Sequence, residues 1–220
     1  MRLVLVIISF SLSSILYSQV IGLQKGFTAG AGVSFFTQYA DSANASSTLP
    51  RMALEGGVSA QLNFLKFFGL GIDAKIQSLG AKVISTEQVK DELGNLSWQK
   101  YTSDYKFTYL EIPTYAKISI GLGPIGIHAF AGPAIQFRLS SVNVKDYENA
   151  SFEDVKIRLR EDANNYVPAI IGGAGFHIKL PSENYFYTQF RMSFQTEELG
   201  VINQNNNQLN AFFMSIGLMY

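Results

Sequence analysis

Hydrophobicity along this chain alternates with a period of two residues. After Gln19, eight successive stretches carry bulky apolar side chains on every second position, with small or polar residues between them. Because successive side chains of a β-strand point to opposite faces, each stretch predicts a strand with one apolar and one polar face. No helical period competes with this pattern. The predicted strands are residues 26–39, 51–64, 68–82, 105–120, 125–140, 166–180, 185–195 and 208–220.

The connections between these strands alternate in length. Those after the second, fourth and sixth strands are short, with the sequences LKF, GLGP and PSEN. The other four are long and polar, and the longest are residues 85–103 and 142–165. Short turns at one end and long loops at the other are typical of outer-membrane barrels. The sequence therefore predicts an all-β fold, an eight-stranded antiparallel up-and-down transmembrane β-barrel with short periplasmic turns and long extracellular loops.

The direction of the apolar face separates a membrane barrel from a soluble one. In a lipocalin-like barrel it points inward and lines a pocket for a small apolar ligand, whereas in a membrane barrel it points into lipid. Here the polar face is poor in charge and rich in Gly and Tyr, and aromatic residues lie near both ends of the apolar faces, which favours the membrane. The two predicted aromatic belts are Phe35, Phe137, Phe194 and Phe212 near the loops, and Phe64, Phe68, Phe186 and Tyr220 near the turns. The soluble barrel remains the alternative.

Three prolines interrupt the predicted strands. Pro113, Pro133 and Pro168 each lack the N–H group that a sheet ladder uses. Pro113 and Pro133 fall near each other on adjacent strands, so we expect a bulge or a local bend there.

Composition and charge exclude several classes of function. The 17 basic and 17 acidic residues give a formal net charge of zero, without a basic stripe, so nucleic acid is not an expected partner. The chain has no cysteine, which rules out disulfides, thiolate metal sites and a cysteine nucleophile. No cofactor is expected.

The first residues have the layout of a secretory signal peptide. A single basic residue, Arg2, precedes an apolar run that is short for a membrane helix and ends in small residues. We expect cleavage after Ser18, so that residues 1–18 are removed and residues 19–220 form the barrel domain in the cell outer membrane.

Polar side chains on the inward face predict a network inside the barrel. Its members are Glu55, Asp73, Lys75, Glu111, Lys117, Arg138, His177, Lys179 and Arg191. An eight-stranded barrel is only wide enough for side chains to fill it, and buried charges persist when they are paired. We therefore expect a salt-bridged plug rather than a narrow pore. The residues expected at its centre are Glu55, Glu111, Arg138 and Arg191.

Catalysis and metal binding have no sequence signature here. The two histidines, His128 and His177, are predicted to face inward near the periplasmic turns, without a cysteine or a carboxylate cluster beside them. A lipid-modifying barrel enzyme needs a base near the outer leaflet, at the opposite end. No G-x-S-x-G motif occurs. We expect no enzyme activity, no catalytic residue and no metal site.

Several segments resemble the PorT-like family of outer-membrane β-barrel proteins. The segment YLEIPTYAKISIG at 109–121 is similar to the family pattern Y-x-E-I-P-x-x-x-K, and AGPAIQF at 131–137 is similar to its next strand. IGGAGFHIKL at 171–180 and the closing SIGLMY also fit. The resemblance implies an eight-stranded antiparallel barrel in a family whose members mostly have no assigned activity. The founding member is linked to protein secretion, but the matching residues are barrel residues, so we do not carry that link over.

The resemblance and the loops also suggest partners. Tyr220 resembles the terminal aromatic residue that barrel-assembly machinery recognises, and the apolar face is expected to contact outer-membrane lipid. The charged segment 145–162 has two interpretations, a solvated loop that continues its strands above the membrane or an edge that binds an envelope protein.

Overall fold

The computed structural model describes residues 22–37, 45–64, 67–90, 96–147, 155–158, 165–181, 184–197 and 208–220. The strands are β1 (Gly22–Thr37), β2 (Ala45–Phe64), β3 (Phe68–Lys90), β4 (Leu96–Leu122), β5 (Ile125–Tyr147), β6 (Val155–Arg158), β7 (Tyr166–Lys179), β8 (Tyr185–Gln195) and β9 (Gln208–Met219). Among these residues, no helix has the length and apolar character needed to cross a bilayer. The predicted signal peptide lies outside the described residues.

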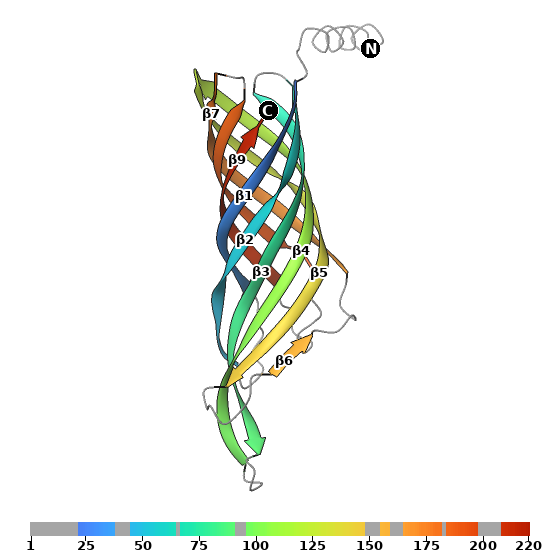
Figure 1. The fold of residues 1–220 in the computed structure, drawn as a ribbon, viewed down its shortest axis with the longest axis vertical. Coiled ribbons are helices and arrows are strands. Elements are labelled where there is room, and N and C mark those ends of the chain that lie inside the picture. The colour runs from blue at the N-terminus through green and yellow to red at the C-terminus, as the bar shows by residue number, and fades with distance from the viewer. Residues whose placement is uncertain are drawn as a thin grey trace, which may run out of the picture.

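Eight of the strands close into an antiparallel ring (Figure 1). The order around the ring is β1, β2, β3, β4, β5, β7, β8 and β9, and β1 pairs with β9 from Gly26–Met219 to Thr37–Gln208. β6 lies outside the ring and pairs with the far end of β5. The start of β1 and the end of β9 lie at the end that carries the short turns. The predicted eight-stranded all-β barrel is confirmed.

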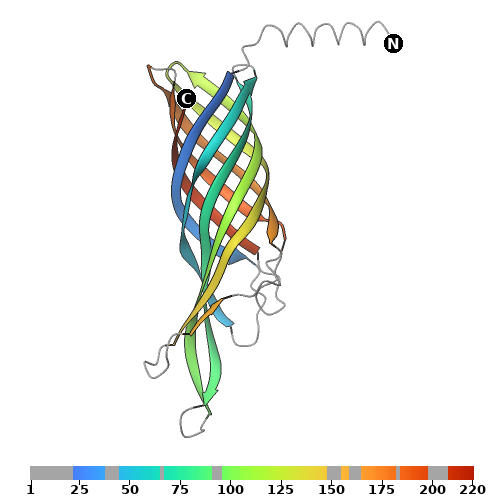
Figure 2. The same cartoon turned by 45° about the vertical axis from the view of Figure 1, so that its right-hand side comes forward.

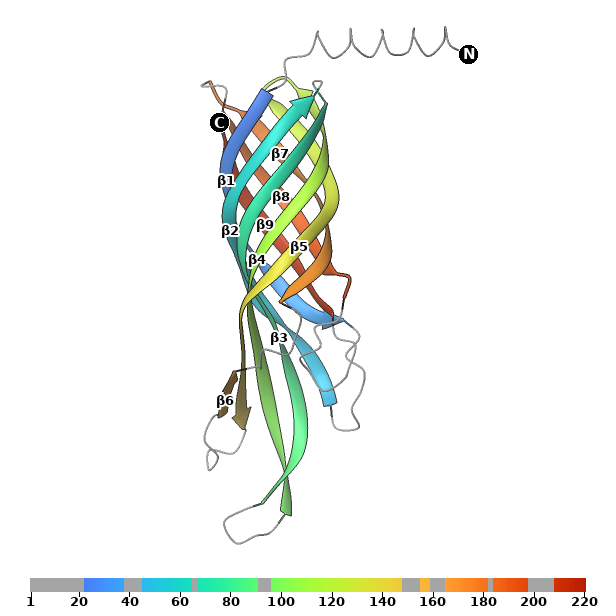
Figure 3. The same cartoon turned by 90° about the vertical axis from the view of Figure 1, so that its right-hand side faces the viewer.

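β3, β4 and β5 continue well beyond the ring at the loop end, where the start of β2 also pairs with β3 (Figures 2 and 3). The predicted loop at 85–103 is wrong over most of its length, because β3 and β4 pair along a hairpin that includes Gln88–Trp98. β5 extends to Tyr147, beside β4 and β6. Apart from Val83, Ser85, Ser103 and Asn143, which are buried, the side chains described in this sheet are exposed or half-buried on both faces. Its residues therefore lack the apolar alternation that marks the barrel strands. We name the part formed by residues 82–90, 96–104, 142–147 and 155–158 the extracellular sheet, after the orientation predicted from the sequence.

Side chains alternate between an exposed outer face and a buried inner face. On β9, for example, Met214 and Ile216 are 68% and 52% exposed, whereas Phe213 and Ser215 are fully buried. Between the two aromatic belts, the outward positions of the described strands carry no charged residue. The lipocalin-like alternative is wrong, because it would bury these apolar side chains. A surface of this kind is stable only when lipid or another apolar phase covers it.

Aromatic rings gather on the outer face near the loop end. Phe212 contacts three other rings, those of Phe35, Phe190 and Phe194, with ring centroids 5.6, 6.0 and 6.1 Å away. At the turn end, the rings of Phe64 and Phe68 are 6.5 Å apart across the β2–β3 turn. The remaining members of the predicted belts, Phe137, Phe186 and Tyr220, are exposed on the same face. Aromatic side chains at these two levels are typical of the membrane–water interfaces of a barrel.

The prolines interrupt pairing without shifting the register. Pro113 pairs with Ala134, and the β4–β5 pairing resumes in the same register at Ala116–Ala131. Of the bulge or local bend expected at Pro113 and Pro133, the bulge is therefore not there, although Thr114 and Tyr115 have no register partner on β5. The register shifts instead between Thr108 and Tyr109, closer to the extracellular sheet. A missing N–H removes one ladder bond, but only an extra residue on one strand moves the register.

Gly32 marks the place where β1 approaches β9 most closely. A Cβ atom added there would overlap the carbonyl oxygen of Phe212. Because that oxygen belongs to the backbone that closes the ring, Gly32→Ala should lower the free energy of unfolding by about 1–3 kcal/mol. Gly121→Ala is the matched control, since a Cβ at Gly121 meets nothing within 4 Å. Guanidinium unfolding of both variants in lipid vesicles measures the difference, and equal stability would contradict the close approach.

Candidate functional site in the barrel interior

The barrel interior has three layers between the loop end and the turn end. An apolar layer fills the loop end, an ion-pair cluster crosses the middle, and a polar hollow opens at the turn end. The three layers come from the same inward positions of successive strands. On β3, for example, the inward residues change from Leu79 through Lys75 to Gly71 as the strand is followed toward its turn.

The apolar layer forms a continuous core at the loop end. Its buried residues are Phe36, Ala53, Leu79, Ala81, Val83, Tyr105, Phe107, Tyr109, Val167, Leu209, Ala211 and Phe213. Phe36 packs edge-on against Tyr105, with ring centroids 5.7 Å apart. The sequence prediction of a polar interior missed this layer. The available signal was the alternation itself, since extending the inward positions of β3 past Gln77 gives Leu79, Ala81 and Val83.

Arg191 is the centre of the ion-pair cluster. Its guanidinium nitrogen Nη1 lies 2.6 Å from Glu55 Oε2, and Nη2 pairs with Glu111 Oε2. Lys75 Nζ lies 3.1 Å from Asp73 Oδ2 and 3.8 Å from Glu55 Oε1. Arg191 and Glu111 are completely buried. Buried charges of this kind are stable because each has a partner of opposite sign.

Amides and hydroxyls complete the hydrogen bonding of the two glutamates. Gln77 Nε2 donates to both, at 3.2 Å from Glu55 and 2.9 Å from Glu111. Ser215 Oγ donates to Glu55 at 2.6 Å. Gln136 Nε2 and Ser193 Oγ donate to Glu111 at 2.9 and 3.0 Å. The cluster is therefore a cross-braced network that links six strands, because its members come from β2, β3, β4, β5, β8 and β9. Together with the apolar layer it occupies the middle and the loop end of the described interior.

The structure brings together three of the four residues predicted for the centre. Glu55, Glu111 and Arg191 meet, whereas Arg138 is half-buried and lies in register with Tyr109, toward the loops. The second cation at the centre is Lys75. Depth inside a barrel depends on the stagger between strands as well as on the distance of a residue from its turn. The sequence gives the second quantity only, which explains the misplacement of Arg138.

The polar hollow at the turn end holds the other predicted residues. We call it the vestibule; it has a volume of ≈ 420 Å³. Its lining residues are Gln24, Gln61, Asn63, Lys117, Ser119, His177, Lys179, Tyr185, Tyr187 and Met219. Lys179 is exposed at the rim, and Lys117 lies deeper.

The histidines lie side by side between the vestibule and the barrel wall. The ring centroids of His128 and His177 are 5.8 Å apart. Gln189 Oε1 lies 3.4 Å from His128 Nε2. Within the described ranges, no group of three or more histidine, cysteine or carboxylate side chains is arranged to hold a metal ion.

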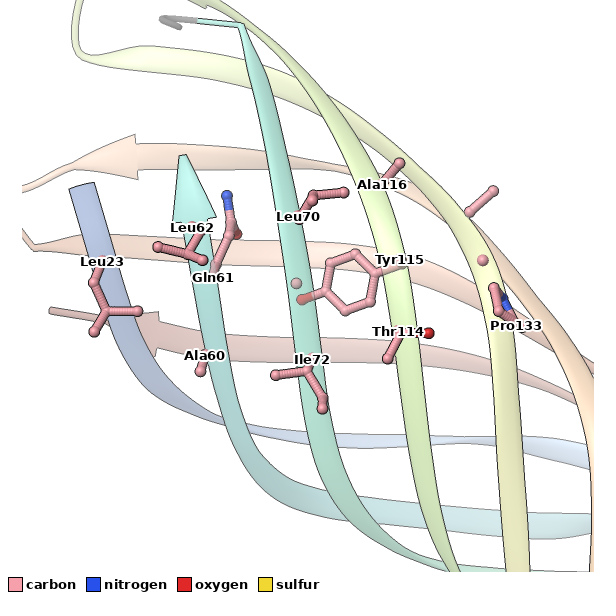
Figure 4. A pocket seen from close by; sticks show the side chains of 13 residues that line it. Leu23, Ala60, Gln61, Leu62, Leu70, Ile72, Thr114, Tyr115, Ala116 and Pro133 are labelled. Carbon is pink, nitrogen blue, oxygen red and sulfur yellow. The ribbon is translucent and has the colours of Figure 1, made fainter. Parts of the chain in front are cut away.

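A second hollow lies on the outer wall, near the turn end of β2, β3, β4 and β5 (Figure 4). It has a volume of ≈ 640 Å³, and Leu23, Leu62, Leu70 and Ile72 form its exposed apolar rim. Tyr115 reaches from β4 toward β3, where a side chain at Gly71 would strike its ring. The Tyr115 hydroxyl donates to Asp73 Oδ1 at 3.0 Å. This hollow faces the surroundings of the barrel, and its floor includes two inward residues, Gln61 and Tyr115.

A comparison with protein-family models agrees with the barrel architecture. A family model described as outer membrane protein beta-barrel domain matches residues 13–195. Among solved structures, Neisserial surface protein A has 11% sequence identity and a TM-score of 0.45, covering 90% of this chain and 97% of that one. Ail, the attachment invasion locus protein of Yersinia pestis, has 10% identity and a TM-score of 0.39, covering 90% and 98%. OprG from Pseudomonas aeruginosa has 11% identity and a TM-score of 0.38, covering 90% and 93%. A search of curated proteins found no match.

Proposed function

Because the chain belongs to the outer membrane protein beta-barrel domain family, we propose that it is a non-catalytic barrel of PorT-like type that acts through its extracellular sheet. The observation that carries the proposal is the contrast between the buried interior of the ring and the strands that continue beyond it. The apolar layer and the ion-pair cluster bury side chains across the loop end and the middle of the described barrel, which supports a plugged interior rather than a pore. The strands nevertheless continue beyond the ring as an ordered surface.

A side-chain cluster fixes the extracellular sheet. Glu87 on β3 accepts hydrogen bonds from Lys145 Nζ at 3.1 Å and from the Tyr147 hydroxyl at 2.5 Å, both on β5. Lys145 also lies 4.5 Å from the ring centroid of Tyr101 on β4. Partial burial opposes ionisation of Glu87, but the two hydrogen bonds and the Lys145 charge outweigh it and hold the pKa of Glu87 below its usual value. The cluster ties three strands together and supports a preformed binding surface rather than a solvated loop.

The tip of this sheet carries apolar groups that suit a protein partner. Trp98 and Leu96 are 61% and 59% exposed near the end of the β3–β4 hairpin. Large exposed aromatic side chains are enriched at protein interfaces. An envelope protein that pairs with the sheet edge and covers Trp98 is the partner we propose.

The other proposed partners follow from the barrel wall. Outer-membrane lipid covers the apolar face and fills the hollow on the outer wall. The barrel-assembly machinery recognises β9 and the terminal Tyr220 that follows it, whose backbone exchanges two hydrogen bonds with Lys25. Export through a signal peptide cleaved after Ser18 remains a prediction. We propose no cofactor and no enzymatic role.

The PorT-like type is supported by the places that its motif occupies. In the segment 109–121, Tyr109 belongs to the apolar layer, Glu111 to the ion-pair cluster and Lys117 to the vestibule. The motif thus contributes one residue to each layer of the interior. A pattern of this kind specifies how the barrel is filled, and it supports a shared interior rather than a shared partner.

Cysteine labelling tests the proposal in whole cells, since the chain has no native cysteine. A membrane-impermeant maleimide should label Trp98→Cys in intact cells and Pro181→Cys, in the β7–β8 turn, only after the outer membrane is opened. Purified protein in planar bilayers should give no single-channel steps. Labelling of Pro181→Cys in intact cells would contradict the orientation, and regular conductance steps would favour a narrow pore instead.

A further inference from the structure

We propose that the vestibule is a binding site for a small oxyanion, such as a phosphate or carboxylate group, which enters from the turn end. The proposal goes beyond the role of the extracellular sheet and does not depend on it. It rests on the hydrogen-bond directions inside the vestibule, on its charges and on its position at the turn end.

Lys117 sets the orientation of three amide side chains. Its ammonium group has only donors, so the atom that it contacts at 3.1 Å must be the carbonyl oxygen Oε1 of Gln61. The Gln61 amide nitrogen therefore points to Asn63, where it donates to Oδ1. The Asn63 nitrogen in turn donates to Gln24 Oε1 at 3.0 Å. The donor and acceptor of each hydrogen bond from Lys117 to the rim are thus fixed by the ammonium group of Lys117, which can only donate.

This series of hydrogen bonds uses the amide oxygens as acceptors and leaves N–H groups for a ligand. Each of the three amides accepts one hydrogen bond within the chain, while the Gln24 nitrogen and the remaining Lys117 N–H groups keep donor capacity. Ser119, Tyr185 and Tyr187 add hydroxyl groups to the lining. A lining of this kind complements a group that carries several acceptor oxygens.

The charges of the vestibule favour the same ligand. Lys117 and Lys179 contribute two positive charges, and among the described residues that line it none is an aspartate or a glutamate. The nearest acidic group toward the barrel centre is Asp73, which lines a small adjoining cavity with Lys117. Asp73 is already paired with Lys75 at 3.1 Å and accepts the Tyr115 hydroxyl at 3.0 Å. Hydrogen bonds between ammonium groups and an anion are roughly twice as strong as neutral ones.

The shape of the vestibule indicates binding rather than passage. Its volume of ≈ 420 Å³ lies within the range of about 300–1,000 Å³ that is usual for small-molecule sites. Beyond the adjoining cavity of ≈ 20 Å³, the ion-pair cluster closes the path toward the loops. A ligand therefore enters and leaves at the turn end, which faces the periplasm in the proposed orientation.

Calorimetry with the full barrel in a neutral maltoside detergent tests the proposal, with inorganic phosphate as the first probe. Micelles doped with phosphatidylglycerol form a second arm, which distinguishes a lipid headgroup from a free anion. Lys117→Gln and Lys179→Gln remove one vestibule charge each, and Lys117→Gln keeps a donor for Gln61. Lys25→Gln is the matched control, since Lys25 is exposed on the outer face at the same end of the barrel. Unboiled gel migration verifies that each variant is folded.

Wild-type protein and Lys25→Gln should bind the anion with equal affinity. Each vestibule variant should bind it at least roughly tenfold more weakly, because a hydrogen bond to a charged group contributes about 1.5–3 kcal/mol. A loss with phosphate assigns the site to free anions, whereas a loss only with the doped micelles assigns it to headgroups. The proposal is overturned if neither probe binds, if the folded vestibule variants bind as well as wild type, or if Lys25→Gln weakens binding to the same extent.

Discussion

Replacing Arg191 with alanine should lower the free energy of unfolding by about 3–5 kcal/mol, the largest effect of any single substitution in the interior. Arg191 is completely buried and pairs with both Glu55 and Glu111. Its removal leaves two carboxylates in a region that water does not reach freely. The contact of Lys75 with Glu55, at 3.8 Å, is longer than the contact of 2.6 Å that Arg191 makes with Glu55. Guanidinium unfolding in lipid vesicles, followed by the unboiled gel band, measures the loss.

Two further variants separate the ion pairs from simple loss of packing. Combining Arg191→Met with Glu55→Gln and Glu111→Gln removes the charges together, and it should recover most of the lost stability because no unpaired charge remains. Arg138→Ala should have a smaller effect, since Arg138 is half-buried and lies toward the loops. If Arg191→Ala were as stable as wild type, the cluster would not be the brace that its geometry indicates.

Met214→Arg should cost about 2–4 kcal/mol by placing a charge in the lipid-facing wall. Met214 is 68% exposed on β9, between the loop-end belt at Phe212 and the terminal Tyr220. In a soluble barrel the same substitution would add a solvated charge at an exposed position and change stability little. The effect therefore measures the environment of the outer face rather than its packing.

Gln88→Arg is the control for the lipid-facing substitution. Gln88 is exposed on the extracellular sheet, opposite Trp98 in the β3–β4 hairpin. An arginine there meets water, so the stability should stay within about 0.5 kcal/mol of wild type. Equal effects at Met214 and Gln88 would argue against a lipid environment at Met214.

The alternation of side chains was sufficient to predict which face each barrel residue occupies. Glu111 and Arg191 alternate with Leu110 and Phe190, and the structure places the first pair inside and the second pair outside. This works because a strand reverses its side chains at every residue, whatever its neighbours are.

Depth and strand length required information that a single sequence lacks. Arg138 and Lys75 both face inward, but the stagger between strands decided that Lys75 reaches Glu55. The extracellular sheet was missed because segments such as 96–102 have exposed or half-buried side chains on both faces, and their polar residues resemble those of a loop. The ordering of this sheet comes from cross-strand contacts such as Glu87–Lys145.

The most direct test is the electrophoretic mobility of the protein from isolated outer membranes, boiled and unboiled. A closed barrel with its apolar face in lipid resists the detergent until heated, so the unboiled sample should migrate differently from the boiled one and should be found in the outer-membrane fraction. A soluble protein with one mobility under both conditions would contradict the account, because the exposed Leu, Ile and Phe side chains of the outer wall would then have no lipid to cover them.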